Sequence, residues 1–192
     1  MSKGRLEAFT DGVIAILITI MVLELKVPHG TDWDALRPLI PVSLTYVLSF
    51  VMLGIYWNNH HHMLQAAHRI NGRILWANLH LLFWLSLIPF VTGWMGENHF
   101  APLPTAVYGA VLLLAGLAFK ILAREFVLEE GPGSKLAAAL GHDRKTNVSL
   151  ALYAAAIPLA FVHEWISDAI FVLVALIWLV PDRRIESRLH ES

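Results

Sequence analysis

The chain has 192 residues, of which 57% are hydrophobic and 15% are charged, and its mean hydropathy is +0.60. Soluble domains carry roughly a quarter charged residues, so this composition excludes an ordinary soluble domain and indicates a membrane protein. The absence of cysteine excludes disulfides and thiolate metal sites. The formal net charge is −1, and we expect no nucleic-acid partner.

Six apolar segments are candidates for membrane crossings, because a bilayer core of about 30 Å needs roughly 20 apolar residues per helix. They cover residues 8–25, 39–57, 74–95, 106–123, 148–162 and 166–180. The last two are short and are joined by a tight turn, so a re-entrant pair is the alternative for them. We expect a single all-α membrane domain over residues 1–192, with six transmembrane helices.

Arg5 and Asp11 stand at the start of the first apolar segment, which reads VIAILITIMVL from Val13 to Leu23. Ionisable groups in lipid are costly and mark partner groups on other helices or a path for ions. Two interpretations of Asp11 stay open: it caps the first helical turn, or it joins a buried network between helices. A signal peptide is disfavoured, because Asp11 directly precedes the apolar run and Glu24 falls where small cleavage-site residues should lie.

Thr19 is the only polar residue of that run, and Ile16, Ile20 and Leu23 lie on the same face of the helix. Since the helix is apolar nearly all round, periodicity cannot select this face over its neighbours. From composition alone, a lipid-facing or packing surface is the simpler interpretation.

Three adjacent histidines, His60 to His62, close the second apolar segment. Consecutive helical residues point about 100° apart and cannot chelate one ion together, and Trp57 stands where a di-iron histidine box would need a ligand. The sequence after His163 fails the zinc-protease HExxH pattern, since Ser167 takes the last place. We therefore expect no metal site, no catalytic residue and no enzyme activity, and we expect the histidines to donate to Asp11 or to backbone carbonyls.

The cationic residues gather on one side of the predicted membrane. An even number of crossings places both termini on the same side, and only Lys26 and Arg37 of the 14 cationic residues fall opposite them. The others are Lys3, Arg5, Arg69, Arg73, Lys120, Arg124, Lys135, Arg144, Lys145, Arg183, Arg184 and Arg188. The positive-inside rule predicts a multi-pass protein of the cell membrane with both termini in the cytoplasm.

The motif Arg5-x-x-x-Phe9-Thr10-Asp11 resembles the RxxxFSD signature of the transmembrane protein 175 potassium-channel family, in its prokaryotic branch. Thr10 replaces the usual serine and keeps the hydroxyl. Later elements resemble the family in the same order: Tyr56-Trp57-x-x-His60-His61, Asn78 and Leu87-Ile-Pro89-Phe90. The resemblance spans all six predicted helices.

The resemblance implies a homotetramer in the lipid bilayer, with four copies of the first helix lining a central pore for monovalent cations. The family's apolar constriction falls at Ile16, with Ile20 and Leu23 one and two turns on, and Thr19 resembles a ring of hydroxyls. A structural network would hold the first helix against its neighbours. Its residues would be Arg5, Phe9, Thr10, Asp11, Trp57, His60, His61 and Asn78.

The function that the resemblance implies is a cation channel with a modest preference for potassium over sodium, without a TVGYG filter. No cofactor is expected beyond permeant potassium ions. The alternative is a proton- or cation-coupled transporter that uses Asp11 and the histidine cluster. Inverted repeats would favour a transporter, but the two halves of the chain show no convincing similarity.

Overall fold

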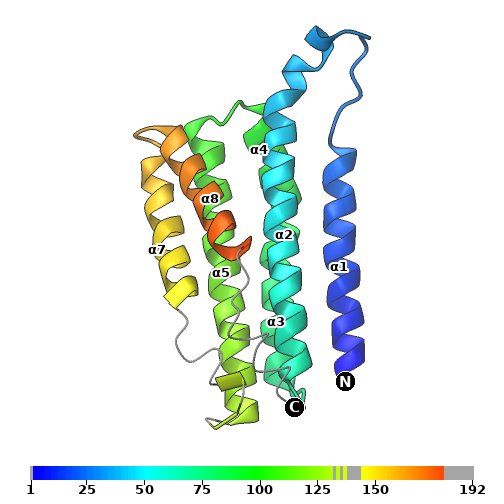
Figure 1. Cartoon of the computed structure of the whole chain (residues 1–192), viewed down its shortest axis with the longest axis vertical. Helices are drawn as coiled ribbons and strands as arrows, with labels where there is room; N and C mark the ends of the chain where they lie inside the picture. The colour runs from blue at the N-terminus through cyan, green and yellow to red at the C-terminus, as the bar shows by residue number, and fades with distance from the viewer. Residues whose placement is uncertain (1, 132, 135, 138–143, 180–192) are drawn as a thin grey trace.

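The structure is a computed structural model that describes residues 2–131, 133–134, 136–137 and 144–179, and every regular element within those ranges is helical. The helices are α1 (Lys3–Leu23), η1 (Trp33–Ala35), η2 (Arg37–Leu39), α2 (Ile40–Ala66), α3 (Gly72–Ser86), α4 (Ile88–Glu97), α5 (Pro102–Glu130), α7 (Arg144–Leu159) and α8 (Glu164–Leu179). Figure 1 shows them as one bundle, with α1 at one edge and α7 at the other.

Helices α3 and α4 continue each other as one apolar segment of 26 residues, Gly72–Glu97. The break falls at Leu87, just before Pro89, which has no N–H to continue the hydrogen-bond ladder. Counted this way, α1, α2, α3–α4, α5, α7 and α8 give six helical segments, which confirms the predicted all-α fold with six helices per subunit.

Four of these segments are long and apolar enough to cross a membrane: Lys3–Leu23, Trp33–Ala66, Gly72–Glu97 and Pro102–Glu130. The described parts of α7 and α8 have 16 residues each. They form a hairpin beside α5 (Figure 1).

The helices extend beyond the apolar segments read from the sequence. Helix α1 begins at Lys3 rather than near residue 8, and α2 runs to Ala66 rather than residue 57. Hydropathy marks the part of a helix that suits lipid, whereas the backbone ladder continues through the polar turns on either side. This difference decides where the polar residues of α1 lie.

Helix α5 is the most buried of the long segments, and two of its glycines allow close packing. A Cβ on Gly109 would lie 3.0 Å from the ring of Phe171 in α8, and one on Gly116 would lie 2.9 Å from Leu150 in α7. Small residues let helices approach closely where no water drives association. The hairpin of α7 and α8 is therefore packed closely against α5.

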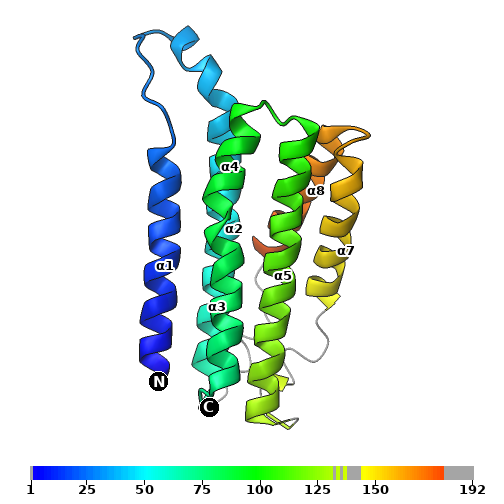
Figure 2. The ribbon, with the colours of Figure 1, turned by 180° about the vertical axis from the view of Figure 1, so that it is seen from behind.

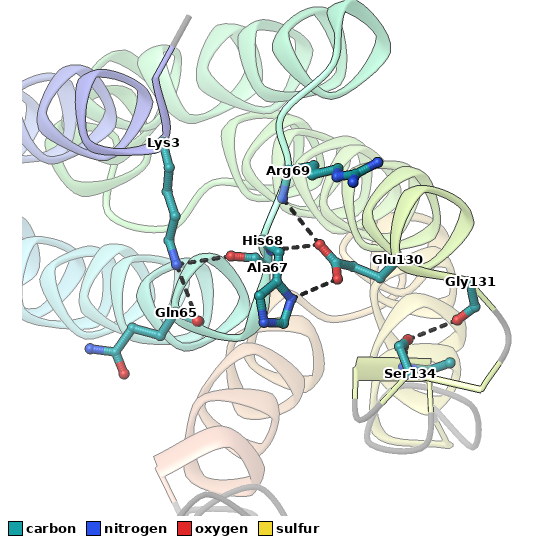
Figure 3. A network of polar contacts seen from close by, with 9 residues as sticks. Lys3, Gln65, Ala67, His68, Arg69, Glu130, Gly131 and Ser134 are labelled. Carbon is teal, nitrogen blue, oxygen red and sulfur yellow. Dashed lines mark hydrogen bonds and ion pairs between the residues drawn. The ribbon is translucent and has the colours of Figure 1, made fainter.

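The connection between α2 and α3 is held from both sides (Figure 3). Lys3 Nζ donates to the carbonyl oxygens of Gln65, at 3.1 Å, and Ala67, at 2.9 Å. The Glu130 carboxylate, at the end of α5, accepts from the backbone N–H of His68 and of Arg69. The start of α1, the α2–α3 connection and the end of α5 thus lie at one end of the bundle.

Candidate pore-lining face and its support

Helix α1 has one face that packs in the bundle and another that is exposed. The packed residues are Leu6, Thr10, Ile14, Leu17 and Met21. On the other side, Ile16 is 57% exposed, Ile20 41% and Leu23 80%, and Thr19 is exposed with them. Contacts with α2, α3 and α4 therefore separate two faces that periodicity could not tell apart. All four residues of the predicted pore face lie on the exposed side.

The hydroxyl of Thr19 is oriented by its own helix. Its Oγ1 donates to the carbonyl oxygen of Ile16, at 2.9 Å, a bond that Ser and Thr often form within helices. The hydroxyl hydrogen is thereby used, and the oxygen keeps its lone pairs. On the exposed face, Thr19 consequently offers an acceptor next to the apolar side chain of Ile16.

A buried chain of hydrogen bonds joins α1, α3 and α2. Asn78 Nδ2 donates to Thr10 Oγ1 at 3.0 Å, and Asn78 Oδ1 lies 2.8 Å from His60 Nε2. All three side chains are at most 1% exposed. Because Asn78 Oδ1 can only accept, His60 donates from Nε2. We call these three residues the buried relay.

Asp11 makes the second link between α1 and α2. Trp57 Nε1 donates to Asp11 Oδ1 at 2.9 Å, and Trp57 stacks on His61, whose Nδ1 lies 3.1 Å from Glu7 Oε1. Since α1 begins at Lys3, Asp11 lies in its third turn, and the interpretation as a helix cap is wrong. The expectation that the histidines donate to Asp11 or to backbone carbonyls is also wrong for His60 and His61, which contact the side chains of Asn78, Glu7 and Gln65 instead.

Arg5 and Phe9 stand apart from these links. Arg5 is exposed, and its side chain forms no hydrogen bond or ion pair with the described part of the chain; Phe9 is 49% exposed. At about 100° per residue, both lie on the side of α1 that carries Ile16 and Leu23. The structure thus brings together Thr10, Asn78 and His60, and separately Asp11, Trp57 and His61, and leaves Arg5 and Phe9 facing away.

Some polar contacts within the bundle were not predicted from the sequence. Ser49 Oγ lies 2.6 Å from Thr92 Oγ1 and 3.0 Å from Tyr108 Oη, which joins α2, α4 and α5. Their only signal is a polar residue inside an apolar segment. Glu7, the partner of His61, was assigned no role from the sequence.

His60 and His61 have separate hydrogen-bond partners. His60 contacts Asn78, whereas His61 contacts Glu7 through Nδ1 and Gln65 through Nε2. Across the described ranges, no three His, Asp or Glu side chains come together in a way that could hold a metal ion.

Comparisons with known proteins agree with the motif. The sequence model of the family described as endosomal/lysosomal potassium channel TMEM175 matches residues 5–89. A potassium channel of Chryseobacterium sp. (strain P1-3) is 52% identical over 192 residues, which covers 100% of both chains. The endosomal/lysosomal proton channel TMEM175 of Gallus gallus is 40% identical over 73 residues, 32% of this chain and 15% of that one.

A solved structure shares the whole fold. It is the crystal structure of a lysosomal potassium-selective channel TMEM175 homolog from Chamaesiphon minutus, with a TM-score of 0.80 and 27% identity, and the match covers 93% of this chain and 96% of that one. These relatives are named as channels, which confirms the expectation that the chain is not an enzyme. The chain therefore belongs to the TMEM175 family, as a prokaryotic member.

Proposed function

We propose that this protein is a potassium-selective cation channel, in which four copies of α1 surround a pore and the Ile16, Thr19, Ile20 and Leu23 face lines it. One observation carries the proposal. Helix α1 stands at the edge of its bundle, fixed on one side and bare on the other. The potassium-channel relatives support the permeant ion.

The position of Arg5 supports the same face. Arg5, Gly12, Ile16 and Leu23 fall within about 40° of one another on the α1 helix, and Arg5 is exposed without a partner in the described part of the chain. A guanidinium that faces hydrocarbon is costly, whereas at the mouth of an aqueous pore it stays hydrated. A lipid-facing assignment would place this charge and the apolar stripe on the same lipid surface.

The four Ile16 side chains would form an apolar constriction where water is depleted. An ion that passes it must lose part of its hydration shell, and K⁺ releases water more readily than Na⁺. Four Thr19 oxygens, with hydrogens already donated to the Ile16 carbonyls, could replace part of that water. This arrangement gives a modest preference for K⁺ rather than the high selectivity of a carbonyl filter.

The links on the packed side of α1 would orient the pore face. The buried relay reaches Thr10, and the indole of Trp57 reaches Asp11, one to two turns before Ile16. Both links fix the rotation of α1 about its own axis. The constriction would then keep its register in every subunit.

For orientation, we propose that the end of the bundle holding Lys3 and the α2–α3 connection is cytoplasmic. Lys3 and Arg69 lie at this end (Figure 3), and Arg73 is in the first turn of α3, which begins there. Lys135, Arg183, Arg184 and Arg188, which contribute to the predicted asymmetry, lie outside the described residues.

The proposal is tested with purified protein in planar bilayers. We expect unitary current steps and, with K⁺ on one side and Na⁺ on the other, a reversal potential that favours K⁺. A pH gradient in the same recordings measures proton permeation separately. Transport without unitary steps would contradict a channel, and equal K⁺ and Na⁺ permeation would contradict the proposed selectivity.

A further inference from the structure

A groove with a volume of about 800 Å³ lies between α3 and α5, at the end of the bundle where the α2–α3 connection lies. The two helices run side by side, in front in Figure 2. The groove is open along its length. Its main side chains are Arg73, Trp76 and His80 from α3, and Ile121, Glu125 and Glu129 from α5.

The groove changes from polar to apolar along its length. Glu129 and Arg73 lie near the helix termini, whereas Trp76 and Ile121 lie one or two turns farther from those termini, together with Glu125 and His80. Trp76 is 75% exposed, and tryptophan favours the boundary between headgroups and acyl chains. A phospholipid likewise has a polar headgroup at one end and apolar acyl chains at the other.

The polar end of the groove has a fixed shape. Asn71 caps α3 by accepting from the backbone N–H of Ile74 at 2.9 Å, and its Nδ2 donates to the Glu129 carboxylate. This side chain thus ties the start of α3 to the end of α5. Glu129 therefore has a hydrogen-bond partner within the protein, and Arg73 and Glu125 are the two charged side chains of the groove that a ligand could bind.

Arg73 and Glu125 are opposite charges on the two sides of the groove. Neither side chain forms an ion pair or a hydrogen bond with any residue that the structure describes, and Glu125 is half-buried. A half-buried carboxylate at a membrane interface needs a cationic partner. A ligand that carries both an anion and a cation would satisfy both side chains.

We propose that this groove binds a phospholipid whose headgroup is zwitterionic and ends in a primary ammonium, as in phosphatidylethanolamine. The phosphate contacts the guanidinium of Arg73, the ammonium donates to the carboxylate of Glu125, and an acyl chain lies along Trp76 and Ile121. A choline headgroup has no N–H to donate to Glu125. A glycerol headgroup has no cation at all.

The test is native mass spectrometry of the purified protein with phosphatidylethanolamine, phosphatidylcholine or phosphatidylglycerol of the same acyl chains. For the unmodified protein we expect about tenfold tighter binding of the ethanolamine lipid than of the other two, the scale of one charged hydrogen bond. Equal binding of all three lipids, or preference for phosphatidylglycerol, would overturn the proposal. So would absence of bound lipid.

Two substitutions assign the roles of the charges. Glu125→Gln should remove the preference for ethanolamine over choline, and Arg73→Gln should weaken the binding of every lipid. Arg69→Gln is the matched control, because Arg69 is exposed at the same end of the bundle and only its backbone N–H is bonded. The same spectra report the assembly of each variant, and an ethanolamine preference that survives in assembled Glu125→Gln protein would also refute the site.

Discussion

The two faces of α1 have similar composition but opposite surroundings. On one side, Thr10, Ile14 and Leu17 are buried against neighbouring helices, and hydrogen bonds fix the helix at two levels. On the other side, Ile16 and Leu23 are exposed within the subunit. We infer that the packed face of α1 stabilises the fold, whereas the exposed face determines permeation. Substitutions on the two faces should therefore have separable effects.

The strongest test of the packed face is Asn78→Ala. It leaves the Nε2–H of His60 and the hydroxyl of Thr10 buried without partners, at about 1–3 kcal/mol for each group. We expect a clear drop in the melting temperature of the detergent-solubilised protein and in the yield of assembled protein. Leu79→Ala, at a 43% exposed neighbour on α3, is the control and should change little. A wild-type melting temperature for Asn78→Ala would show that the buried relay does not stabilise the fold.

The strongest test of the bare face is Ile16→Asn. An amide at each constriction site admits water and lowers the dewetting barrier, so unitary conductance should rise several-fold and the preference for K⁺ should shrink, while the melting temperature stays near wild type. The control is Val22→Asn, which is 45% exposed but lies about 120° round the helix. If Val22→Asn alters conduction and Ile16→Asn does not, the pore face is assigned wrongly.

A smaller effect on the packed face is expected from Asp11→Ala. The substitution removes the acceptor of the Trp57 indole and should lower stability by about 1 kcal/mol, since this link is partly exposed. Asp11→Asn keeps an oxygen acceptor and should recover most of the loss in thermal denaturation. Equal melting of all three proteins would mean that the Trp57 bond adds nothing.

On the bare face, Thr19→Val should change selectivity more than current. It removes the hydroxyl oxygen and keeps the shape, so the ratio of K⁺ to Na⁺ permeability should fall about two- to threefold, if each site loses a fraction of a kcal/mol. Thr19→Ser, which keeps the hydroxyl, should behave as wild type in reversal-potential measurements. A selectivity change in the serine variant alone would argue against a role for the oxygen.

The smallest effect is expected outside both faces, at the ion pair of Lys26 Nζ and Glu97 Oε1, 2.7 Å apart and exposed. The hydrogen bond to Glu97 raises the pKa of Lys26 above its ordinary value of 10.5. A raised lysine pKa stabilises the fold below that value, and the stabilisation is lost as the pH rises through the folded-state pKa. Lys26→Gln should therefore melt near wild type at neutral pH, and any difference should vanish as the pH rises through the folded-state pKa of Lys26, and in high salt.

The sequence predicts the crossings of this protein better than its contacts. Six apolar segments and one motif were enough for the fold and the family. The resemblance named Thr10, Asn78 and His60 among eight residues of one network, but it did not tell which of them pair. For Asp11 the sequence left a helix cap and a network between helices open, because hydropathy marks the lipid-facing length of α1, whereas the cap position depends on where the helix begins, at Lys3. The bond from Trp57 of α2 favours the network.

The bare face could not be derived from periodicity, since nearly every residue from Val13 to Leu23 is apolar. Only the neighbouring helices separate Ile14, which is 2% exposed, from Ile16, which is 57% exposed. Contacts such as Glu7 with His61 depend on long-range packing in the same way, and polar residues near a helix end give no signal of it.

The α2–α3 connection is held by hydrogen bonds from Lys3 on one side and to Glu130 on the other, and this has a consequence for biosynthesis. The hydrogen bonds from Lys3 can form once the chain has been synthesised as far as Ala67, just after the second helix. The hydrogen bonds to Glu130 join it to His68, so they cannot form until the end of α5 has been synthesised. The first two helices can thus pair early in the translocon, while the connection that follows them stays open on one side until the fourth crossing arrives.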